Sequence, residues 1–260
     1  MPNLLLLFFL CLPIAHALEV TWYGHSAFRI KSNKGTVILI DPWIANPLNT
    51  SHRQVLADLK KADYILLTHG HGDALGDTEQ ILNQTNAKII TTYSLASRLI
   101  HTLKFPADRI PGELQLDVGG EIRLEPDVYL MATQAVHSSE VIDENNQIWS
   151  AGPAIGFLIH FENDKTVYHT GDTGLFMDMK LVTLVREVDI MLVCIGGQYT
   201  MGPRTAAVAA SLVKPALVVP MRFQTFPALK GTPDELEKQF KSIGYTGKMK
   251  VLDINKYYEL

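Results

Sequence analysis

Two histidines and a carboxylate lie close together in one short stretch of the chain. Residues 68–74 read Thr-His-Gly-His-Gly-Asp-Ala, so His69 and His71 are two positions apart and Asp73 follows two positions later. Imidazole nitrogen suits zinc and similar borderline metals, and a nearby carboxylate can serve as a ligand or as a base. Two histidines in an exposed polar loop would give the same pattern, so the pair alone leaves both interpretations open.

The segments on either side place this stretch in a fold. Residues 64–67, Tyr-Ile-Leu-Leu, form an apolar run that predicts a short buried strand, and the residues from Leu75 to Leu82 predict the start of a helix. The stretch therefore lies at a strand-to-helix turn. Its two glycines let the backbone turn tightly enough for neighbouring side chains to converge.

The stretch resembles the pattern His-x-His-x-Asp-His that follows a strand in the metallo-β-lactamase superfamily. Together with further blocks in the same order, it is similar to the branch of small metal-dependent hydrolases that includes lactonase-like proteins, from about Glu19 to Pro227. The resemblance implies an α/β fold of the αββα sandwich type, with metal ligands on loops along one edge of two stacked sheets. The supporting blocks are residues 24–28 (Gly-His-Ser-Ala-Phe), 168–174 (Tyr-His-Thr-Gly-Asp-Thr-Gly) and 200–203 (Thr-Met-Gly-Pro).

Members of this superfamily hold two metals, and the resemblance implies that the first site is complete here. Carried over by position, its ligands are His69, His71 and His137, and the aspartate that bridges the two metals is Asp172. Taken alone, His137 would be uninformative, and Asp172 between two glycines could merely cap a helix that begins near Leu175. Their positions in the family pattern favour metal ligation.

The second metal site departs from the family pattern. It keeps Asp73, but Ala74 and Arg222 stand where the pattern has histidines. A methyl group binds no metal, and a guanidinium carries a fixed positive charge and has no lone pair to donate. We therefore expect one divalent metal, zinc in the first place with manganese as the alternative, and a degraded second position.

An empty second position would leave Asp73 and Asp172 as partly buried negative charges that need a counter-charge. We expect the guanidinium of Arg222 to occupy that position and to pair with one or both aspartates. The alternative is that this long side chain reaches into solvent. His25 and His169, which lie in the family blocks, are candidates to support the site, and His25 could equally be a hydrogen-bonded structural histidine.

Two hypotheses of different classes follow for the function. The first is a metal-dependent hydrolase of a small ester, lactone or phosphoester, in which Asp73 accepts a proton and Arg222 stabilises developing negative charge. The second is an exported ligand- or protein-binding module on the same fold that has lost catalysis. The loss of two ligands at one site motivates the second hypothesis. The intact histidines weigh against it, because a pure binding role requires no metal ligands.

The whole chain fits one α/β domain over residues 18–260. Strands and helices alternate in both halves, which independently favours layers of α and β structure. The net charge of -4 gives no electrostatic reason to expect nucleic acid or an anionic membrane surface as a partner, and we expect a small-molecule substrate. The predicted strands include 19–30, 36–40, 88–92, 121–124, 128–132, 166–169, 190–195 and 216–220, and the predicted helices include 51–61, 94–103, 203–211 and 233–240.

Residues 1–17 have the pattern of a secretory signal peptide. Leu4 to Ile14 is an apolar run, and residues 15–17, Ala-His-Ala, fit a small-x-small cleavage site. The run is too short to span a bilayer, so we expect no stable membrane span and export to a periplasm or beyond after cleavage near Ala17. Because residues 1–3 contain no Lys or Arg, a buried N-terminal element is the alternative. After cleavage Cys194 would be the only cysteine, which excludes an internal disulfide.

Overall fold

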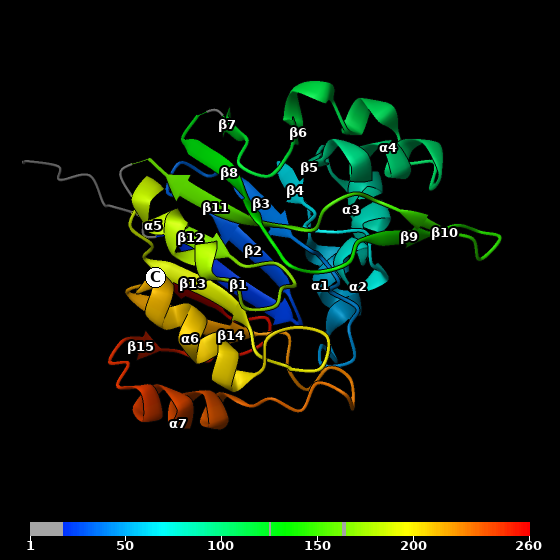
Figure 1. Ribbon diagram of the computed structural model, residues 1–260. Coiled ribbons are helices and arrows are strands. Elements are labelled where there is room, and N and C mark those ends of the chain that lie inside the picture. The colour runs from blue at the N-terminus through cyan, green and yellow to red at the C-terminus, as the bar shows by residue number, and fades with distance from the viewer. Residues whose placement is uncertain (1–17, 125, 163–164) are drawn as a thin grey trace, which may run out of the picture.

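Two β-sheets stacked face to face form the centre of the molecule, and helices cover their outer faces (Figure 1). The computed structural model describes residues 18–260 except 125 and 163–164. The first sheet has the strand order β16-β1-β2-β3-β4-β5-β6, and the second has the order β15-β14-β13-β12-β11-β8-β7. This architecture confirms the expected αββα sandwich.

The first sheet consists of β1 (Glu19–Gly24), β2 (Ala27–Lys31), β3 (Val37–Ile40), β4 (Tyr64–Leu66), β5 (Lys88–Thr92), β6 (Gln115–Leu116) and β16 (Tyr257–Glu259). The second consists of β7 (Glu121–Leu124), β8 (Val128–Gln134), β11 (Ile155–Phe161), β12 (Thr166–His169), β13 (Ile190–Cys194), β14 (Leu217–Met221) and β15 (Lys248–Met249). A separate hairpin is formed by β9 (Glu140–Ile142) and β10 (Ile148–Ser150).

The helices fall into two groups, one on each side of the sandwich. Side chains of the first sheet form a buried cluster with α1 (His52–Asp58), α3 (Thr78–Gln84) and α4 (Tyr93–His101). The second sheet packs against α5 (Val182–Val185), α6 (Pro203–Val213) and α7 (Pro233–Ile243). The four-residue helix α2 (Gly72–Leu75) lies at the sheet edge that carries the histidine stretch.

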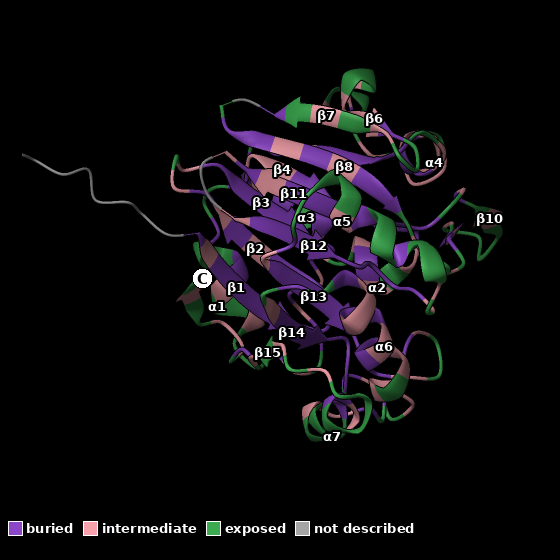
Figure 2. Cartoon of the chain, turned by 60° about the vertical axis from the view of Figure 1, so that its left-hand side comes forward, coloured by how far each residue is buried: buried purple, intermediate pink, exposed green. Residues whose placement is uncertain are grey.

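The side-chain alternation of a strand explains why the first sheet is buried on both faces. Ile38 and Ile40 on β3 belong to the apolar cluster between the sheets, whereas Leu39 belongs to the cluster under the helices. Successive side chains of a strand point to opposite faces, so a continuous apolar run fits a strand that is covered on both sides. Figure 2 accordingly shows the central strands as buried and the outer surfaces of the helices as partly exposed.

The strand directions bring four site-bearing loops to one edge of the molecule. β12, β13 and β14 are parallel neighbours. β8 runs in the same direction, since it is antiparallel to β11, which is antiparallel to β12. The carboxyl ends of β8, β12 and β14 therefore meet at one edge of the second sheet. The loop after β4 of the first sheet meets them there, because Ile155 N–H donates to the carbonyl of Thr68.

Several predicted elements have different bounds in the structure. The helix predicted from Leu75 is split into α2 and α3, because Gly76 between them has a φ of 46°. The helix predicted over 51–61 ends at Asp58. The helix expected near Leu175 begins as a 3-10 helix, η3 (Met177–Leu181), and continues into α5.

Several elements were absent from the sequence prediction, and three features of the fold depend on them. β11 lies between β8 and β12 in the centre of the second sheet, the β9–β10 hairpin projects from the sandwich, and β16 pairs with β1 near the end of the chain. The signal peptide expected over residues 1–17 lies outside the described residues and stays a prediction. Among the helices of the described residues, none is long and apolar enough to cross a membrane.

Candidate metal centre

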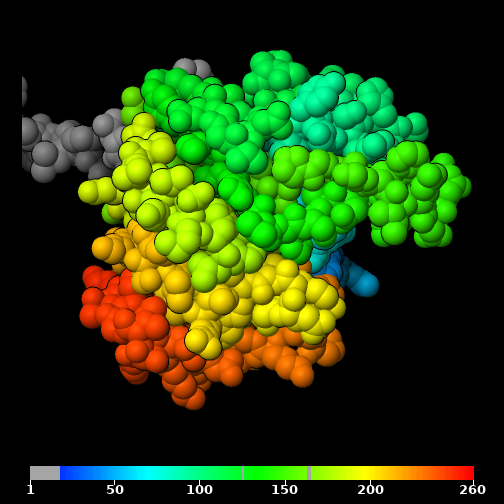
Figure 3. Space-filling model, viewed as in Figure 1, coloured from blue at the N-terminus to red at the C-terminus, as the bar shows by residue number. Residues whose placement is uncertain are grey.

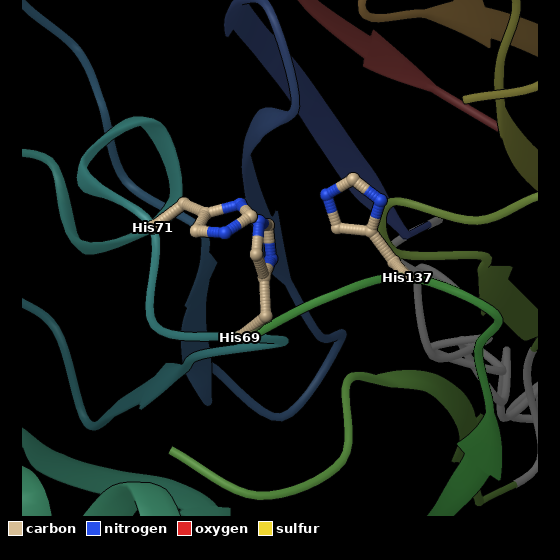
Figure 4. Close-up of side chains that lie close together, drawn as sticks. All are labelled: His69, His71 and His137. Atoms are coloured by element: carbon tan, nitrogen blue, oxygen red, sulfur yellow. The ribbon is translucent and has the colours of Figure 1, made fainter. Parts of the chain in front are cut away.

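The structure brings the three predicted histidine ligands together, although they come from distant parts of the chain (Figure 4). His69 follows β4, His71 stands immediately before α2, and His137 lies beyond the end of β8. Their ring centroids are 4.7 to 5.2 Å apart. One nitrogen of each ring lies within 4.8 Å of the others, so the three could hold one metal ion.

The hydrogen bonds of His69 leave one nitrogen free for a metal. Its Nδ1 lies 2.9 Å from the hydroxyl of Thr68, and that hydroxyl donates to Asp41 Oδ2 at 2.6 Å. Because the single hydroxyl proton goes to Asp41, the hydroxyl oxygen accepts the Nδ1 proton of His69. Nε2 then carries a lone pair. It is buried and has no hydrogen-bond partner among the described residues, as is also true of His137 Nε2.

Burial further suits these rings to metal ligation. It lowers the pKa of His69 to about 4 and also lowers the pKa of His137, so both rings are neutral near pH 7. Neutral imidazole is the form that binds a metal. Buried nitrogens without partners are costly to a folded protein, and a metal ion would satisfy both. The donor set therefore fits the metal that the sequence pattern implies.

Glu140 orients the third ring, and sequence analysis missed it. His71 Nε2 lies 2.8 Å from Glu140 Oε2, so the carboxylate accepts the Nε2 proton and leaves Nδ1 as the available ligand atom. This hydrogen bond from His71 lowers the pKa of Glu140. Glu140 begins β9, 69 positions away from His71 in the sequence. No local pattern marks such a contact.

Asp172 lies beside the histidines at the end of β12. It is 1% exposed, and its Oδ2 is 3.7 Å from His69 Nε2 and 3.6 Å from His137 Nε2. One oxygen of Asp172, one oxygen of Asp73 and one nitrogen of His69 also lie within 4.8 Å of one another. The position of Asp172 is thus compatible with a ligand that faces both the histidines and a second cation.

The guanidinium of Arg222 is that second cation. Arg222 is 3% exposed; its Nη2 lies 3.1 Å from Asp73 Oδ2, and its Nε lies 2.5 Å from Asp172 Oδ2. The side chain pairs with both aspartates and does not reach into solvent. Ala74 is 1% exposed in α2 and offers no ligand atom. A fixed positive charge thus stands between the carboxylates that would otherwise need a metal.

Asp73 is held by two donors. His25 Nε2 lies 3.2 Å from Asp73 Oδ2, the oxygen that also accepts from Arg222, and His25 Nδ1 lies 2.8 Å from Thr225 Oγ1. Burial acts to raise the pKa of Asp73, but the hydrogen bond from His25 and the charge of Arg222 outweigh it and hold the pKa below its usual value. Asp73 is therefore ionised near neutral pH.

His169 connects two loops of the site by hydrogen bonds. Its Nδ1 accepts the N–H of Gly171, and its Nε2 therefore carries the proton that is donated to the carbonyl of Ser26 at 3.1 Å. Burial lowers the pKa of His169 to about 4, so the ring is neutral. Both nitrogens are engaged and neither is free for a metal. The ring joins the loop that carries Asp172 to the turn that carries His25.

Three residues of this centre have an unusual backbone conformation. His25, Asp41 and Arg222 have φ values of 50°, 42° and 55°, a left-handed region that residues other than glycine rarely adopt. The backbone of Arg222 is held there by a hydrogen bond from its N–H to the carbonyl of His25 at 3.0 Å. Such conformations cost about 1–3 kcal/mol each and cluster at functional sites, so the strain favours a site in use.

A cavity of about 670 Å³ opens onto these side chains. Its lining includes His71, His137, Asp73 and Arg222, and the side chains of Trp43, Tyr199 and Phe226 form an aromatic wall. The rings of Trp43 and Phe226 stack with centroids 5.5 Å apart. The centre is therefore reachable by a small molecule.

The sequence is similar over most of its length to proteins described as metal-dependent hydrolases. A family model described as a β-lactamase superfamily domain matches residues 19–222. A UPF0173 metal-dependent hydrolase of Thermodesulfovibrio yellowstonii is 46% identical over 239 residues, which cover 90% of either chain.

Solved structures show the same architecture. Igni18, a metallo hydrolase of Ignicoccus hospitalis, is 31% identical with a TM-score of 0.79, and the match covers 94% of this chain and 99% of that one. YhfI of Bacillus subtilis, a metallo-β-lactamase fold protein, is 14% identical with a TM-score of 0.69, and the match covers 93% and 99% of the two chains. At 14% identity this second likeness shows the fold alone.

Proposed function

The chain belongs to the β-lactamase superfamily, and from this premise we propose that it hydrolyses a small ester, lactone or phosphoester with the help of one divalent metal. The family match and the metal-dependent hydrolase that is 46% identical support the reaction class. The proposal of a single metal rests on the ion pairing of Arg222 with both Asp73 and Asp172. A second metal would have to displace a buried guanidinium from these carboxylates.

His69, His71, His137 and Asp172 would hold the metal, because imidazole nitrogen and carboxylate oxygen are ligands that zinc takes. We propose zinc, with manganese as the alternative. When bound, such an ion acidifies water and polarises a substrate oxygen. Glu140 and Thr68 would keep the rings of His71 and His69 in the tautomers that expose a lone pair.

The chain itself supplies proton transfer and charge balance. Asp73 lines the cavity as an ionised carboxylate, so it can accept a proton from the attacking water. His25 holds this carboxylate in place through a 3.2 Å contact. Arg222 balances the charge of the aspartates and can stabilise negative charge that develops on the substrate.

Metal content and turnover test this proposal together. We expect about one metal per chain after zinc loading, and hydrolysis that is lost when the metal is stripped and regained when it is returned. His71→Ala should abolish turnover, whereas His101→Ala, an exposed histidine on α4, should leave it unchanged. Equal turnover in the metal-stripped protein would refute the metal-dependent reaction, and two metals per chain would refute the one-metal form.

The second candidate is a binding module that has lost catalysis. Ala74 and Arg222 favour it, because both remove second-metal ligands of the family pattern. The double variant Ala74→His, Arg222→His separates the two candidates. Turnover that appears only in the double variant would favour the binding module, and turnover already present in the wild type would exclude it.

We also propose that the protein is exported. The apolar run from Leu4 to Ile14 and the small residues up to Ala17 support a cleaved signal. The N-terminal residue of the protein isolated from its host tests this. A mature chain that begins at Leu18 is expected, and a chain that retains Met1 or Pro2 in the cytoplasm would contradict export.

A further inference from the structure

Two hollows adjoin at the metal centre, and both have apolar walls. The cavity with the aromatic wall shares His71 and Gly72 with a second hollow of about 470 Å³. Leu75, Ile142 and Ile148 form the wall of this second hollow. A molecule whose reacting bond lies at His71 would therefore have room for a substituent on each side of that bond.

The two walls differ in chemistry. Trp43 and Phe226 present stacked aromatic rings, with an interplanar angle of 26°, and rings of this kind favour an aromatic substituent. The second wall is aliphatic. Ile142 and Ile148 face each other across the β9–β10 hairpin and are 60% and 66% exposed, which is unusual for isoleucine. Figure 3 shows this hairpin protruding at the right-hand edge of the molecule.

Apart from the proposed metal, the hollows offer an anionic substrate no side-chain cation that is free of carboxylates among the described residues. Among the residues that the structure describes, Arg222 is the only Lys or Arg that lines either hollow. Asp73 and Asp172 already balance its charge, and its unpartnered Nη1 is buried. Glu140 also lines the second hollow, but its carboxylate already accepts a hydrogen bond from His71. Phosphate groups are usually bound by arginine or lysine side chains that are free to donate to them.

We propose that the substrate is a neutral carboxylic ester with an aromatic alcohol part and an aliphatic acyl part. This assignment rests on the hydrolase function proposed above. The alcohol part lies against Trp43 and Phe226, and the acyl chain lies against Ile142 and Ile148. In the reaction the water oxygen bonds to the acyl carbon and the acyl–oxygen bond breaks. One proton of the water goes to the alcohol oxygen and the other to solvent, which leaves a carboxylate and an alcohol.

A set of matched substrates tests this assignment in the metal-loaded protein. The set is p-nitrophenyl hexanoate, p-nitrophenyl acetate, p-nitrophenyl phosphate and bis(p-nitrophenyl) phosphate, with each kcat/KM divided by the uncatalysed rate. We expect the hexanoate to exceed the acetate by about tenfold, because its four additional methylene groups would be only partly buried in a hollow whose isoleucines are largely exposed. Both phosphate esters should rank below the two carboxylic esters. A phosphate ester at the top of the ranking would overturn the proposal and leave the hydrolase function intact.

Two isoleucine variants locate the acyl chain. Ile148→Ser should remove most of the preference for hexanoate over acetate, because it removes apolar surface from the second hollow. Ile243→Ser is the matched control, since Ile243 is an exposed isoleucine at the end of α7 and should leave the preference unchanged. An unchanged preference in Ile148→Ser would overturn the assignment of the acyl chain.

A binding measurement separates failure of this proposal from failure of the hydrolase function. The probe is the ketone in which a methylene group replaces the ester oxygen of p-nitrophenyl hexanoate, measured by calorimetry. We expect Ile148→Ser to weaken its binding several-fold and Ile243→Ser to leave it unchanged. If no ester is hydrolysed but the ketone binds in this way, the substrate class stands and the hydrolase function fails. If the ketone does not bind, the substrate class is wrong.

Discussion

Arg222 replaces a metal ligand of the family pattern with a permanent charge. Its guanidinium contacts Asp73 and Asp172, and all three side chains are largely buried. Removing one partner of a buried ion pair typically costs about 3–5 kcal/mol, because the remaining charges lose their counter-charge. The role of Arg222 can therefore be tested by measuring the free energy of unfolding as well as the activity.

We expect Arg222→Met to lower the free energy of unfolding of the metal-stripped protein by about 3 kcal/mol or more. Denaturant unfolding measures this. Arg53→Met, at an exposed position of α1, serves as the control and should change stability by less than about 0.5 kcal/mol. Equal stability of the two variants would show that the aspartates do not need the guanidinium.

Glu140 acts on the metal only through His71. The carboxylate accepts the Nε2 proton at 2.8 Å, which fixes the ring and raises its basicity. We expect Glu140→Ala to weaken metal binding by about 10- to 100-fold, measured by competition with a chelating dye. Glu144→Ala, at an exposed position in the turn of the same hairpin, should leave the affinity unchanged. If both variants bind metal equally well, Glu140 does not orient His71.

At the scale of elements, the break between α2 and α3 lies directly against the loop that carries Trp43. Gly76 has a φ of 46°, and a Cβ at this position would lie 2.4 Å from Trp43 Cα. Both features exclude a side chain without backbone movement. The break therefore couples the helix that carries Asp73 to the loop that carries Trp43.

We expect Gly76→Ala to destabilise the protein by about 2 kcal/mol or more and to weaken turnover through the displacement of α2. Gly112→Ala is the control, because nothing lies within 4 Å of a Cβ there. Thermal unfolding of both variants measures the difference. A Gly76→Ala variant as stable as the Gly112→Ala variant would contradict the importance of the break.

For the whole molecule, a metal at the centre would tie the two sheets together. His69 follows a strand of the first sheet, whereas His137 and Asp172 follow strands of the second. A ligand that binds only the folded state stabilises it by RT ln(1 + [L]/Kd), which is about 2.7 kcal/mol at a hundredfold excess over Kd. Metal loading should thus raise the unfolding temperature of the whole sandwich.

We expect zinc to raise the midpoint of thermal unfolding by several degrees relative to protein with a chelator. His137→Ala should remove this shift, because it deletes a ligand from the second sheet. The exposed variant His101→Ala should retain it. A shift of the same size in His137→Ala would place the metal elsewhere in the protein.

The sequence by itself determined the fold class and named the candidate metal ligands. Apolar runs with period-two or continuous patterns predicted most central strands, because burial of both faces leaves a plain signal in sequence. Fixed spacing in the histidine stretch, and its likeness to a family pattern, pointed to His69, His71, His137 and Asp172. The capping box at Thr232 and Glu235 predicted the start of α7, since a cap is a local interaction.

Only the tertiary structure decided which distant side chains meet. The contact of Arg222 with Asp73, which spans 149 positions, was expected only from the family pattern, and that of His71 with Glu140, which spans 69, was not expected at all. Local sequence patterns do not predict such pairs, because the contacts depend on how the sheets stack and where the hairpin turns back. The same holds for the aromatic and aliphatic walls beside the metal centre, whose residues are ordinary apolar positions in sequence. Long-range packing, and not local pattern, thus decided which residues complete the site.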